Sequence, residues 1–360
     1  MVNGFSRIEL SNLMWEKPYF AQIELTRNCN FSCKFCFANC DYTKKYEEKS
    51  YNDWIKVINE LYELGIKYLH FSGGENFLYK DYKKILQYSH EKGLKNLVNT
   101  NGYFDIENVL DYVDNFVFSV HGYKEVHDNI VNVKGAFDKV DKNIEIAVKN
   151  DKKVSINTVL IKENINNYEK LYNYLYSKYR NKIKYSPTIA IPCKTGKKID
   201  SISIELTKEN MQKYLKIIQK IGDKNLIYKH GLHGLCSLDR NDNDFFMPVC
   251  AAGKSKLIIK YNGNVYPCNF FQTDEYMCGN VFKDNLTEIW KHGKGFQIFR
   301  KYYLDEDLPK KCTQCKKKNN CYSGCKAWTK SYMNGDIKIK KERDERCEII
   351  NAFIGNWNNY

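Results

Sequence analysis

The sequence contains three closely spaced cysteines, Cys29, Cys33 and Cys36, directly after the apolar segment 21–26. Three thiolates on one short loop can bind three irons of a [4Fe–4S] cluster, which normally takes four cysteines. The fourth iron would keep an open coordination position, where chemistry can take place. Zinc is a poorer explanation, because it usually takes paired Cys-x₂-Cys units and would be a ligand short here.

Length and composition indicate a large protein with a metal function. A chain of 360 residues predicts two domains, or one large barrel with an appendage, and a hydrophobic content of 43% is sufficient for a large core. The first 20 residues have no apolar signal region, and no segment reaches the ~18 apolar residues of a membrane span. We therefore expect a cytoplasmic protein, in which fourteen cysteines point to metal rather than disulfides.

The formal charge of +14 raises the question of an acidic partner. The lysines are scattered along the chain, and the one dense run, at 310–318, is interrupted by two cysteines. An ordinary solvated surface is the preferred interpretation, and an anionic peptide is the alternative. We expect neither nucleic acid nor a membrane as a partner.

Strand-like and helix-like segments alternate between residues 21 and 222, which is typical of βα units around a parallel sheet. The predicted strands lie near 21–26, 67–71, 95–99, 116–120, 153–160 and 183–189. The predicted helical stretches lie near 51–64, 81–92, 105–112, 136–149, 166–179 and 207–221. Six such units are too few for a closed eight-stranded barrel.

The cysteine run, with Phe35 before its third cysteine, resembles the radical S-adenosylmethionine (SAM) enzymes. The resemblance implies an α/β fold, a partial (β/α)₆ TIM-like barrel whose site lies at the C-terminal strand ends. It also implies that Cys29, Cys33 and Cys36 hold a [4Fe–4S] cluster whose open iron binds SAM.

Further motifs follow the predicted strands. Gly73, Gly74 and Glu75 come after the second strand, where glycine allows close backbone approach to a ligand, and the resemblance assigns this loop to the SAM ammonium. Ser119 ends the fourth strand, and by resemblance its hydroxyl reaches the ribose or carboxylate of SAM. Asn157 is a polar residue on an otherwise apolar fifth strand, and it faces either SAM or the outside.

The chain departs from the family at several positions. Asn76 replaces the usual proline, which alters loop stiffness more than ligand chemistry. His121 replaces a frequent aspartate and is either an ordinary loop imidazole or a site-lining group that titrates near neutrality. Val131 replaces an arginine for the SAM carboxylate, so that salt bridge is missing or is supplied elsewhere. Lys134 is a candidate replacement, although lysine cannot form the same bidentate contact.

The C-terminal part carries a second ordered set of cysteines, with Asn262-Gly263-Asn264 predicted as a hairpin turn. The set comprises Cys250, Cys268, Cys312, Cys315, Cys321, Cys325 and Cys347. Seven thiolates can in principle hold two zinc ions, but this spacing resembles the SPASM extension of radical SAM enzymes, which implies two auxiliary iron–sulfur clusters of the [4Fe–4S] type. Two segments, 279–281 and 286–290, also resemble that extension.

The resemblance assigns Cys250, Cys268 and Cys325 to the first auxiliary cluster, and Cys312, Cys315, Cys321 and Cys347 to the second. Some relatives have a further cysteine where this chain has Lys256. The fourth ligand of the first cluster is therefore Cys236, Cys278 or none, the last leaving an open iron. Cys40 and Cys193 remain outside these patterns, and each is either a buried apolar thiol or a hydrogen-atom donor to a substrate radical.

The predicted boundaries are an N-terminal extension at 1–20, the barrel at 21–222, a linker at 223–249, the SPASM domain at 250–350 and a tail at 351–360. The resemblance implies reductive cleavage of SAM to a 5′-deoxyadenosyl radical that abstracts hydrogen from a ribosomally made peptide, forming a crosslink, thioether or epimer. A separate carrier protein would present the peptide, because only about 17 residues precede the barrel. A flavodoxin or ferredoxin would serve as the reductant.

Three alternatives remain open. A sulfatase maturase that forms formylglycine fits the size, but this chain lacks a cysteine at position 256 and an arginine at position 131. A radical SAM dehydrogenase acting on a small molecule is the second alternative. A non-catalytic iron–sulfur or zinc scaffold is the third, and the Gly-Gly-Glu and Ser119 elements argue against it, because a scaffold needs no SAM site.

Overall fold

The computed structural model describes residues 16–40, 43, 45–190, 208–222, 250–301, 308–315, 323–329, 338 and 341–348. The predicted linker and tail lie outside the described residues, as do Cys193, Cys236 and Cys321.

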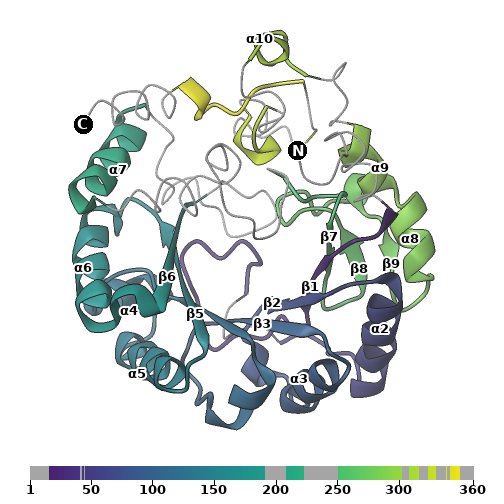
Figure 1. The fold of residues 1–360 in the computed structure, drawn as a ribbon, viewed down its shortest axis with the longest axis horizontal. Helices are drawn as coiled ribbons and strands as arrows, with labels where there is room; N and C mark the ends of the chain where they lie inside the picture. Colours follow the sequence, from purple (N-terminus) through teal and green to yellow (C-terminus); the bar gives the residue numbers. More distant parts are fainter. Residues whose placement is uncertain are drawn as a thin grey trace.

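A parallel sheet carries the first half of the chain, as the alternating pattern predicts. Its strands are β1 (Phe20–Glu24), β2 (Tyr68–Ser72), β3 (Lys95–Thr100), β4 (Asn115–Ser119), β5 (Lys153–Leu160) and β6 (Ile183–Ile189). Each strand pairs in parallel with the next one along the chain. The strands curve around a common centre with helices outside them, which confirms the partial barrel (Figure 1).

The outer helices connect successive strands. They are α2 (Tyr51–Leu64), α3 (Tyr82–Glu91), α5 (Ala136–Lys149), α6 (Tyr168–Tyr179) and α7 (Lys208–Ile221). The stretch expected at 105–112 is a 3₁₀ helix over Glu107–Tyr112, and the short helix α4 (Glu125–Val131) was not predicted. Two turns of helix give too few periodic positions for recognition from sequence.

Capping residues define the first of these helices. The Ser50 hydroxyl accepts a hydrogen bond from the Asp53 amide at 3.2 Å, and the Ser50 amide donates to the Asp53 carboxylate at 3.1 Å. This reciprocal capping box satisfies two backbone groups at the start of α2. Gly65 ends the helix with a φ of 100°, a conformation that glycine adopts without strain.

Alternation along each strand separates two faces of the sheet. On β5, Val154, Ile156 and Leu160 are buried toward the helices, as are Phe116 and Phe118 on β4. The intervening residues are half-buried and line the inner, concave face. The main core therefore lies between sheet and helices, and the inner face carries the polar residues.

The second half of the chain joins the same sheet. Strands β7 (Lys256–Ile259), β8 (Asn264–Tyr266) and β9 (Gly279–Asn280) extend it beyond β1 in the order β6-β5-β4-β3-β2-β1-β7-β8-β9. The β7–β8 pair is antiparallel and turns at Gly263, whose φ is 87°, which confirms the predicted hairpin. Because β7 runs parallel to β1, the cysteine-rich half forms one wall of the barrel.

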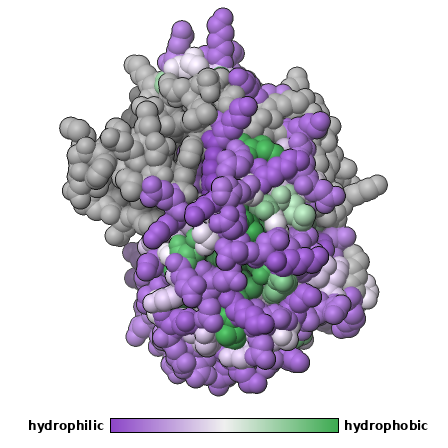
Figure 2. Space-filling view, turned by 90° about the vertical axis from the view of Figure 1, so that its right-hand side faces the viewer, coloured by the Kyte–Doolittle hydropathy of each residue, from purple (hydrophilic) through white to green (hydrophobic). Residues whose placement is uncertain are grey.

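Helices α8 (Leu286–His292), α9 (Lys294–Lys301) and α10 (Lys310–Thr313) follow this hairpin. The face that carries α2, α8 and α9 is mostly hydrophilic, with apolar residues in small separate patches (Figure 2). No helix in the described residues is both long enough and apolar enough to pass through a bilayer.

Candidate functional site: three groups of cysteines and a glycine loop

The loop after β1 presents Cys29, Cys33 and Cys36 at the carboxyl end of the barrel. The amides of Ser32 and Lys34 donate to the Val131 and Ile130 carbonyls at 3.2 and 3.1 Å, so the last turn of α4 fixes the loop. Cys29 and Cys33 pack against the buried residues Phe31, Val131 and Ala136. Val131, which departs from the arginine that the family resemblance implies at this position, therefore supports the cysteine loop through apolar contact.

Cys40 lies against this triad. Its amide donates to the Cys36 sulfur at 3.3 Å, and the Cys40 side chain is buried. Contact with Cys36, burial and the nearby Cys29 all raise the pKa of the Cys40 thiol. A hydrogen bond to a cluster sulfur is a common means of tuning such a site, and whether Cys40 also donates a hydrogen atom remains a prediction.

Arg27 holds the far end of the same loop, and sequence reasoning missed it. Its Nε donates to the Ala38 carbonyl at 2.7 Å. The guanidinium lies 5.2 Å from the Tyr46 ring centre and 5.7 Å from that of Tyr261, which is on the β7–β8 turn. Arg27 thus connects the cysteine loop to the hairpin of the cysteine-rich half.

The predicted glycine loop lies directly beside the cysteine loop. Gly74 and Glu75 amides donate to the Thr26 and Asn28 carbonyls at 3.0 and 2.8 Å. A Cβ on Gly73 would lie 2.7 Å from the Thr26 carbonyl oxygen, and one on Gly74 would lie 2.1 Å from that of Asn28. Only glycine fits at either position, and the two loops form one unit at the ends of β1 and β2.

Glu75 ties this unit to the next strand. Its buried carboxylate accepts hydrogen bonds from the Thr100 hydroxyl at 3.0 Å and the Asn101 amide at 2.8 Å. Burial raises the pKa of Glu75 to about 7, although these hydrogen bonds oppose the shift. The turn at residues 100–102, which follows β3, is therefore a partner of Glu75. Asn76 makes a second contact with β3, because its side-chain Nδ2 donates a hydrogen bond to the Asn99 backbone carbonyl at 3.0 Å.

The opposite wall carries Ser119 and Asn157. These residues pair directly across β4 and β5, and Ser186 continues the row on β6. All three are half-buried, whereas Asn157's neighbours Ile156 and Thr158 are buried. This alternation places Asn157 on the inner face, in the same row as Ser119.

His121 is a buried residue of this wall. Its Nδ1 accepts from the Val159 amide at 3.2 Å, and its ring packs edge-on against Phe35 of the cysteine loop, with centroids 4.6 Å apart. Burial lowers the pKa of His121 well below its usual value, so the imidazole is neutral. Burial therefore favours the interpretation of His121 as a structural imidazole over that of a group that titrates near neutrality. Lys134 is exposed, so its role toward SAM rests on the resemblance alone.

Cys250, Cys268 and Cys325 come together beside β7. Burial raises the pKa of Cys268, and the neighbouring Cys250 and Cys325 thiols add to this effect. Cys250 acts on Cys325 in the same way. These are the three residues that the resemblance assigns to one auxiliary cluster. Their convergence from distant positions fits a shared metal group, although their role as ligands remains a prediction.

Cys278, one of the candidates for the fourth ligand, is a buried thiol, and whether it binds a cluster stays a prediction. Its thiol is buried, lies 3.5 Å from the Tyr276 carbonyl and sits where a Cβ on Gly295 would approach it within 2.9 Å. Burial raises the Cys278 pKa to about 12, and the amides of Phe296 and Gly295 oppose that shift. The Cys278 side chain thus packs against the first turn of α9, at Gly295 and Phe296.

A third group contains Cys312, Cys315 and Cys347. Burial raises the pKa of Cys312, and Cys347 and Cys315 raise it further. Cys321, assigned by resemblance to the same set, lies outside the described residues. Among the described residues, no three His, Cys, Asp or Glu side chains converge on a single metal ion. A four-iron cluster binds each thiolate at a different iron, so its ligands need not meet at one point.

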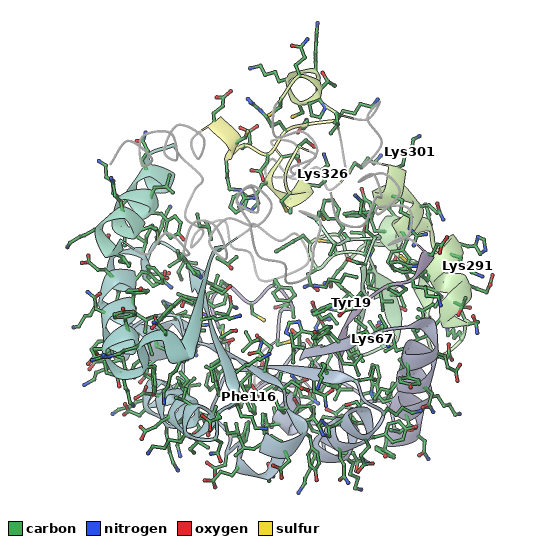
Figure 3. The ribbon with its side chains drawn as sticks, in the orientation of Figure 1. Tyr19, Lys67, Phe116, Lys291, Lys301 and Lys326 are labelled. Carbon is green, nitrogen blue, oxygen red and sulfur yellow. The ribbon has the colours of Figure 1, made fainter. Side chains whose placement is uncertain are left out.

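Lysine side chains lie close to the cysteines of the C-terminal half of the chain. Burial lowers the pKa of Lys254 to about 8, and the Cys250 thiol opposes the shift. Lys256, on β7, interacts electrostatically with Cys268 and Cys250. Lys326 is buried within the cysteine-rich segment, whereas Lys291 and Lys301 project from α8 and α9 into solvent (Figure 3). Buried cations of this kind offset the negative charge of thiolate-bound clusters.

The buried pair Asp344–Arg346 links two of the cysteine groups. Arg346 Nη2 lies 2.6 Å from the Asp344 carboxylate, and both side chains are inaccessible to solvent or nearly so. The same carboxylate accepts from the Cys325 amide at 3.1 Å. Since Cys347 directly follows Arg346 in the chain, this pair fixes Cys325 and Cys347 relative to each other.

Comparisons with known families agree with this geometry. The family model of the radical SAM superfamily matches residues 23–175, and that of the SPASM iron–sulfur cluster-binding domain matches residues 250–316.

Curated relatives match over most of the chain. An AdoMet-dependent heme synthase from Methanosarcina barkeri is 25% identical, over 87% of this chain and 93% of its own. The mycofactocin maturase MftC from Mycolicibacterium smegmatis is 26% identical, over 87% of this chain and 79% of its own.

Solved structures with the same fold include two further proteins. Streptococcus suis SuiB bound to its precursor peptide SuiA has a TM-score of 0.69 and 19% identity, covering 95% of this chain and 79% of SuiB. Native anSMEcpe with bound AdoMet has a TM-score of 0.72 and 18% identity, covering 95% of this chain and all of anSMEcpe. At such identities the likeness establishes the fold.

Proposed function

We propose a peptide-modifying activity for this chain, which belongs to the radical SAM superfamily and carries a SPASM iron–sulfur cluster-binding domain. Its cofactors are a [4Fe–4S] cluster with SAM, and auxiliary iron–sulfur clusters in the SPASM domain. When bound and reduced, the first cluster would supply the electron that cleaves SAM to methionine and a 5′-deoxyadenosyl radical, and this radical would take hydrogen from the substrate.

The residues of the chain would hold and orient these groups. Cys29, Cys33 and Cys36 would bind the first cluster on a loop that α4 and Arg27 keep in place. The glycine loop, which packs directly against the cysteine loop, would present its backbone to the amino end of SAM. Ser119 and Asn157 would contact the rest of SAM from the opposite wall. The observation that carries the SAM-cleaving part of the proposal is the direct hydrogen bonding of the cysteine loop to the glycine loop.

Two findings favour a peptide as the substrate. The curated relatives include the mycofactocin maturase MftC, and the fold is shared with SuiB, which was solved with a precursor peptide. The net charge of +14 would suit an acidic leader segment. A separate carrier protein presenting the peptide and a flavodoxin or ferredoxin reductant complete the proposal.

A second candidate is a reaction on a small molecule in haem formation. It is favoured by the heme synthase relatives, which align along most of both chains. The sulfatase-maturase alternative rests on the likeness to anSMEcpe, which at 18% identity concerns the fold.

The test is anaerobic turnover of the reconstituted protein with SAM and dithionite. We expect 5′-deoxyadenosine in all cases, and faster formation with a short acidic peptide encoded beside the gene. The peptide should lose hydrogen mass, or take up deuterium from the solvent if it is epimerised. Turnover stimulated by a porphyrin and by none of the neighbouring peptides would support the second candidate. Absence of 5′-deoxyadenosine would contradict radical SAM chemistry itself.

A further inference from the structure

Lys256 carries a positive charge on the inner face of β7. The next residue, Leu257, belongs to the main core, so the Lys256 side chain extends from the opposite face of the strand. There it lies beside Phe20, its partner on β1, with Nζ 5.3 Å from the centre of the Phe20 ring. An aromatic ring of this kind holds an ammonium group in place and leaves its charge unneutralised.

Two lysines of β7 and its turn differ in their charge partners. Lys260, which directly follows β7, contacts the buried Glu24 carboxylate. Among the described residues, the charges that act on the pKa of Lys256 come from the thiols of Cys268 and Cys250, and none comes from a carboxylate. A half-buried cation is costly unless negative charge lies nearby to offset it. The surroundings of Lys256 therefore suit a negatively charged group bound at these cysteines.

The register of the hairpin explains why Cys268 lies so close. Ile258 pairs with Tyr266 across β7 and β8. When this register is continued by two residues on each side, Lys256 lies opposite Cys268. Side chains that oppose each other across an antiparallel pair share one face of the sheet, with their Cβ atoms about 5 Å apart. The Lys256 ammonium and the Cys268 thiol thus extend from the same face.

A tight turn brings Cys250 to the same place. The Lys256 amide donates to the Ala251 carbonyl at 3.1 Å, and Ala252 forms an isolated β-bridge with Lys256. The chain therefore folds back on itself directly after Cys250. Lys256 lies next to two of the three cysteines that converge beside β7.

We propose that the Lys256 ammonium raises the reduction potential of the auxiliary cluster beside it. This inference rests on the proposed function, in which Cys250, Cys268 and Cys325 hold that cluster. Reduction adds negative charge to a thiolate-bound cluster, and a fixed cation nearby favours the reduced form. Some relatives have a cysteine where this chain has Lys256, so the effect belongs to this chain and not to the SPASM extension in general.

The test is a redox titration of the reconstituted protein, followed by electron paramagnetic resonance. Lys256→Met keeps the length of the side chain and removes its charge. We expect it to lower the midpoint potential of one auxiliary cluster, with an equilibrium constant for reduction at least tenfold smaller, or about 59 mV for one electron. The second auxiliary cluster should keep its potential. Spectra of a protein in which Cys29, Cys33 and Cys36 are replaced by alanine identify the auxiliary signals.

Further variants separate the charge from the packing. Lys256→Arg keeps the positive charge, and its cluster should titrate near the wild-type potential. Lys301→Met removes an exposed charge from the end of α9 (Figure 3) and should leave every potential unchanged, because solvent and salt screen it. Iron content and melting temperature are measured for each protein. If Lys256→Met does not retain its iron, Lys256→Gln, which keeps a polar end group, takes its place in the comparison.

The outcomes are distinct. An unchanged potential in an iron-loaded Lys256→Met or Lys256→Gln protein would overturn the inference and leave the proposed function intact. An equal shift in Lys256→Arg would overturn it too, because the charge would then not be the cause. If the potential shifts as expected and the wild-type protein forms no 5′-deoxyadenosine, the inference stands and the proposed function fails.

Discussion

The first cysteine group and the first auxiliary group are built in opposite ways. Cys29, Cys33 and Cys36 lie on one loop that neighbouring loops hold by backbone hydrogen bonds. Cys250, Cys268 and Cys325 come from distant points of the chain and meet only because β7 and β8 join the barrel sheet. The first site depends on local sequence, whereas the second depends on the tertiary structure around it. Removing ligands should therefore affect chemistry at one site and stability at the other.

Replacing each trio by alanine tests this difference most directly. Without Cys29, Cys33 and Cys36, 5′-deoxyadenosine formation should fall to the level of the no-enzyme control, with the smaller fall in melting temperature, because these ligands lie on one loop and do not connect distant segments. Without Cys250, Cys268 and Cys325, the melting temperature should fall clearly, because metal bound only by the folded state stabilises it. Iron content, product analysis and circular dichroism measure these effects. Equal loss of stability in both variants would contradict the comparison.

Asp344→Asn tests whether the buried Asp344–Arg346 pair stabilises the segment that carries Cys325 and Cys347. The substitution leaves the buried Arg346 guanidinium without its charge partner, and we expect a loss of about 3–5 kcal/mol in the free energy of unfolding. The matched control is Asp81→Asn, which breaks an exposed contact with Lys84 on α3 and should leave the unfolding curve unchanged. Denaturant titration of the metal-loaded proteins measures the free energy of unfolding of both variants. If both variants unfold alike, the buried pair is not a support of the cysteine-rich half.

Glu75→Gln tests how the buried Glu75 carboxyl group, which connects the glycine loop to β3, affects the pH dependence of stability. Burial raises the folded-state pKa of Glu75 to about 7, above the model-peptide value of 4.5, so the folded protein binds the proton more tightly than the unfolded chain. The contribution of this group to stability is present below pH 4.5 and is lost as the pH rises to about 7, by at most about 3 kcal/mol. The variant should lack this decline. Unfolding curves of equal pH dependence would indicate an unshifted carboxyl.

The same contrast explains what could be predicted from the sequence. Strand positions, the cysteine loop and the glycine loop follow from local periodicity and spacing, and the structure contains them within a few residues of the expected bounds. The packing of Cys278 against Gly295 of α9 depends on a contact between segments that are separate in the sequence. Nothing local to β1 predicts that β7 pairs with it. Glu24, Arg27 and Lys260 were missed for that reason, since their partners lie in other segments.

Ser119 gives the smallest expected effect, because it lies on the wall opposite the two loops. Its hydroxyl is half-buried at the end of β4, and loss of one neutral hydrogen bond to SAM corresponds to about 1 kcal/mol, or roughly fivefold weaker binding. Ser119→Ala should leave the melting temperature unchanged, since the hydroxyl has no hydrogen-bond partner within the described residues.

Ser89→Ala is the converse control. The buried Ser89 hydroxyl contacts the Leu86 carbonyl at 3.0 Å and the Asn96 side chain at 2.8 Å, on the helix side of β3. Its removal should lower stability and leave SAM affinity unchanged, which is the opposite of Ser119→Ala. Should Ser119→Ala destabilise the fold and leave SAM binding intact, the β4–β5 wall would be structural, and SAM would be held by the β1 and β2 loops alone.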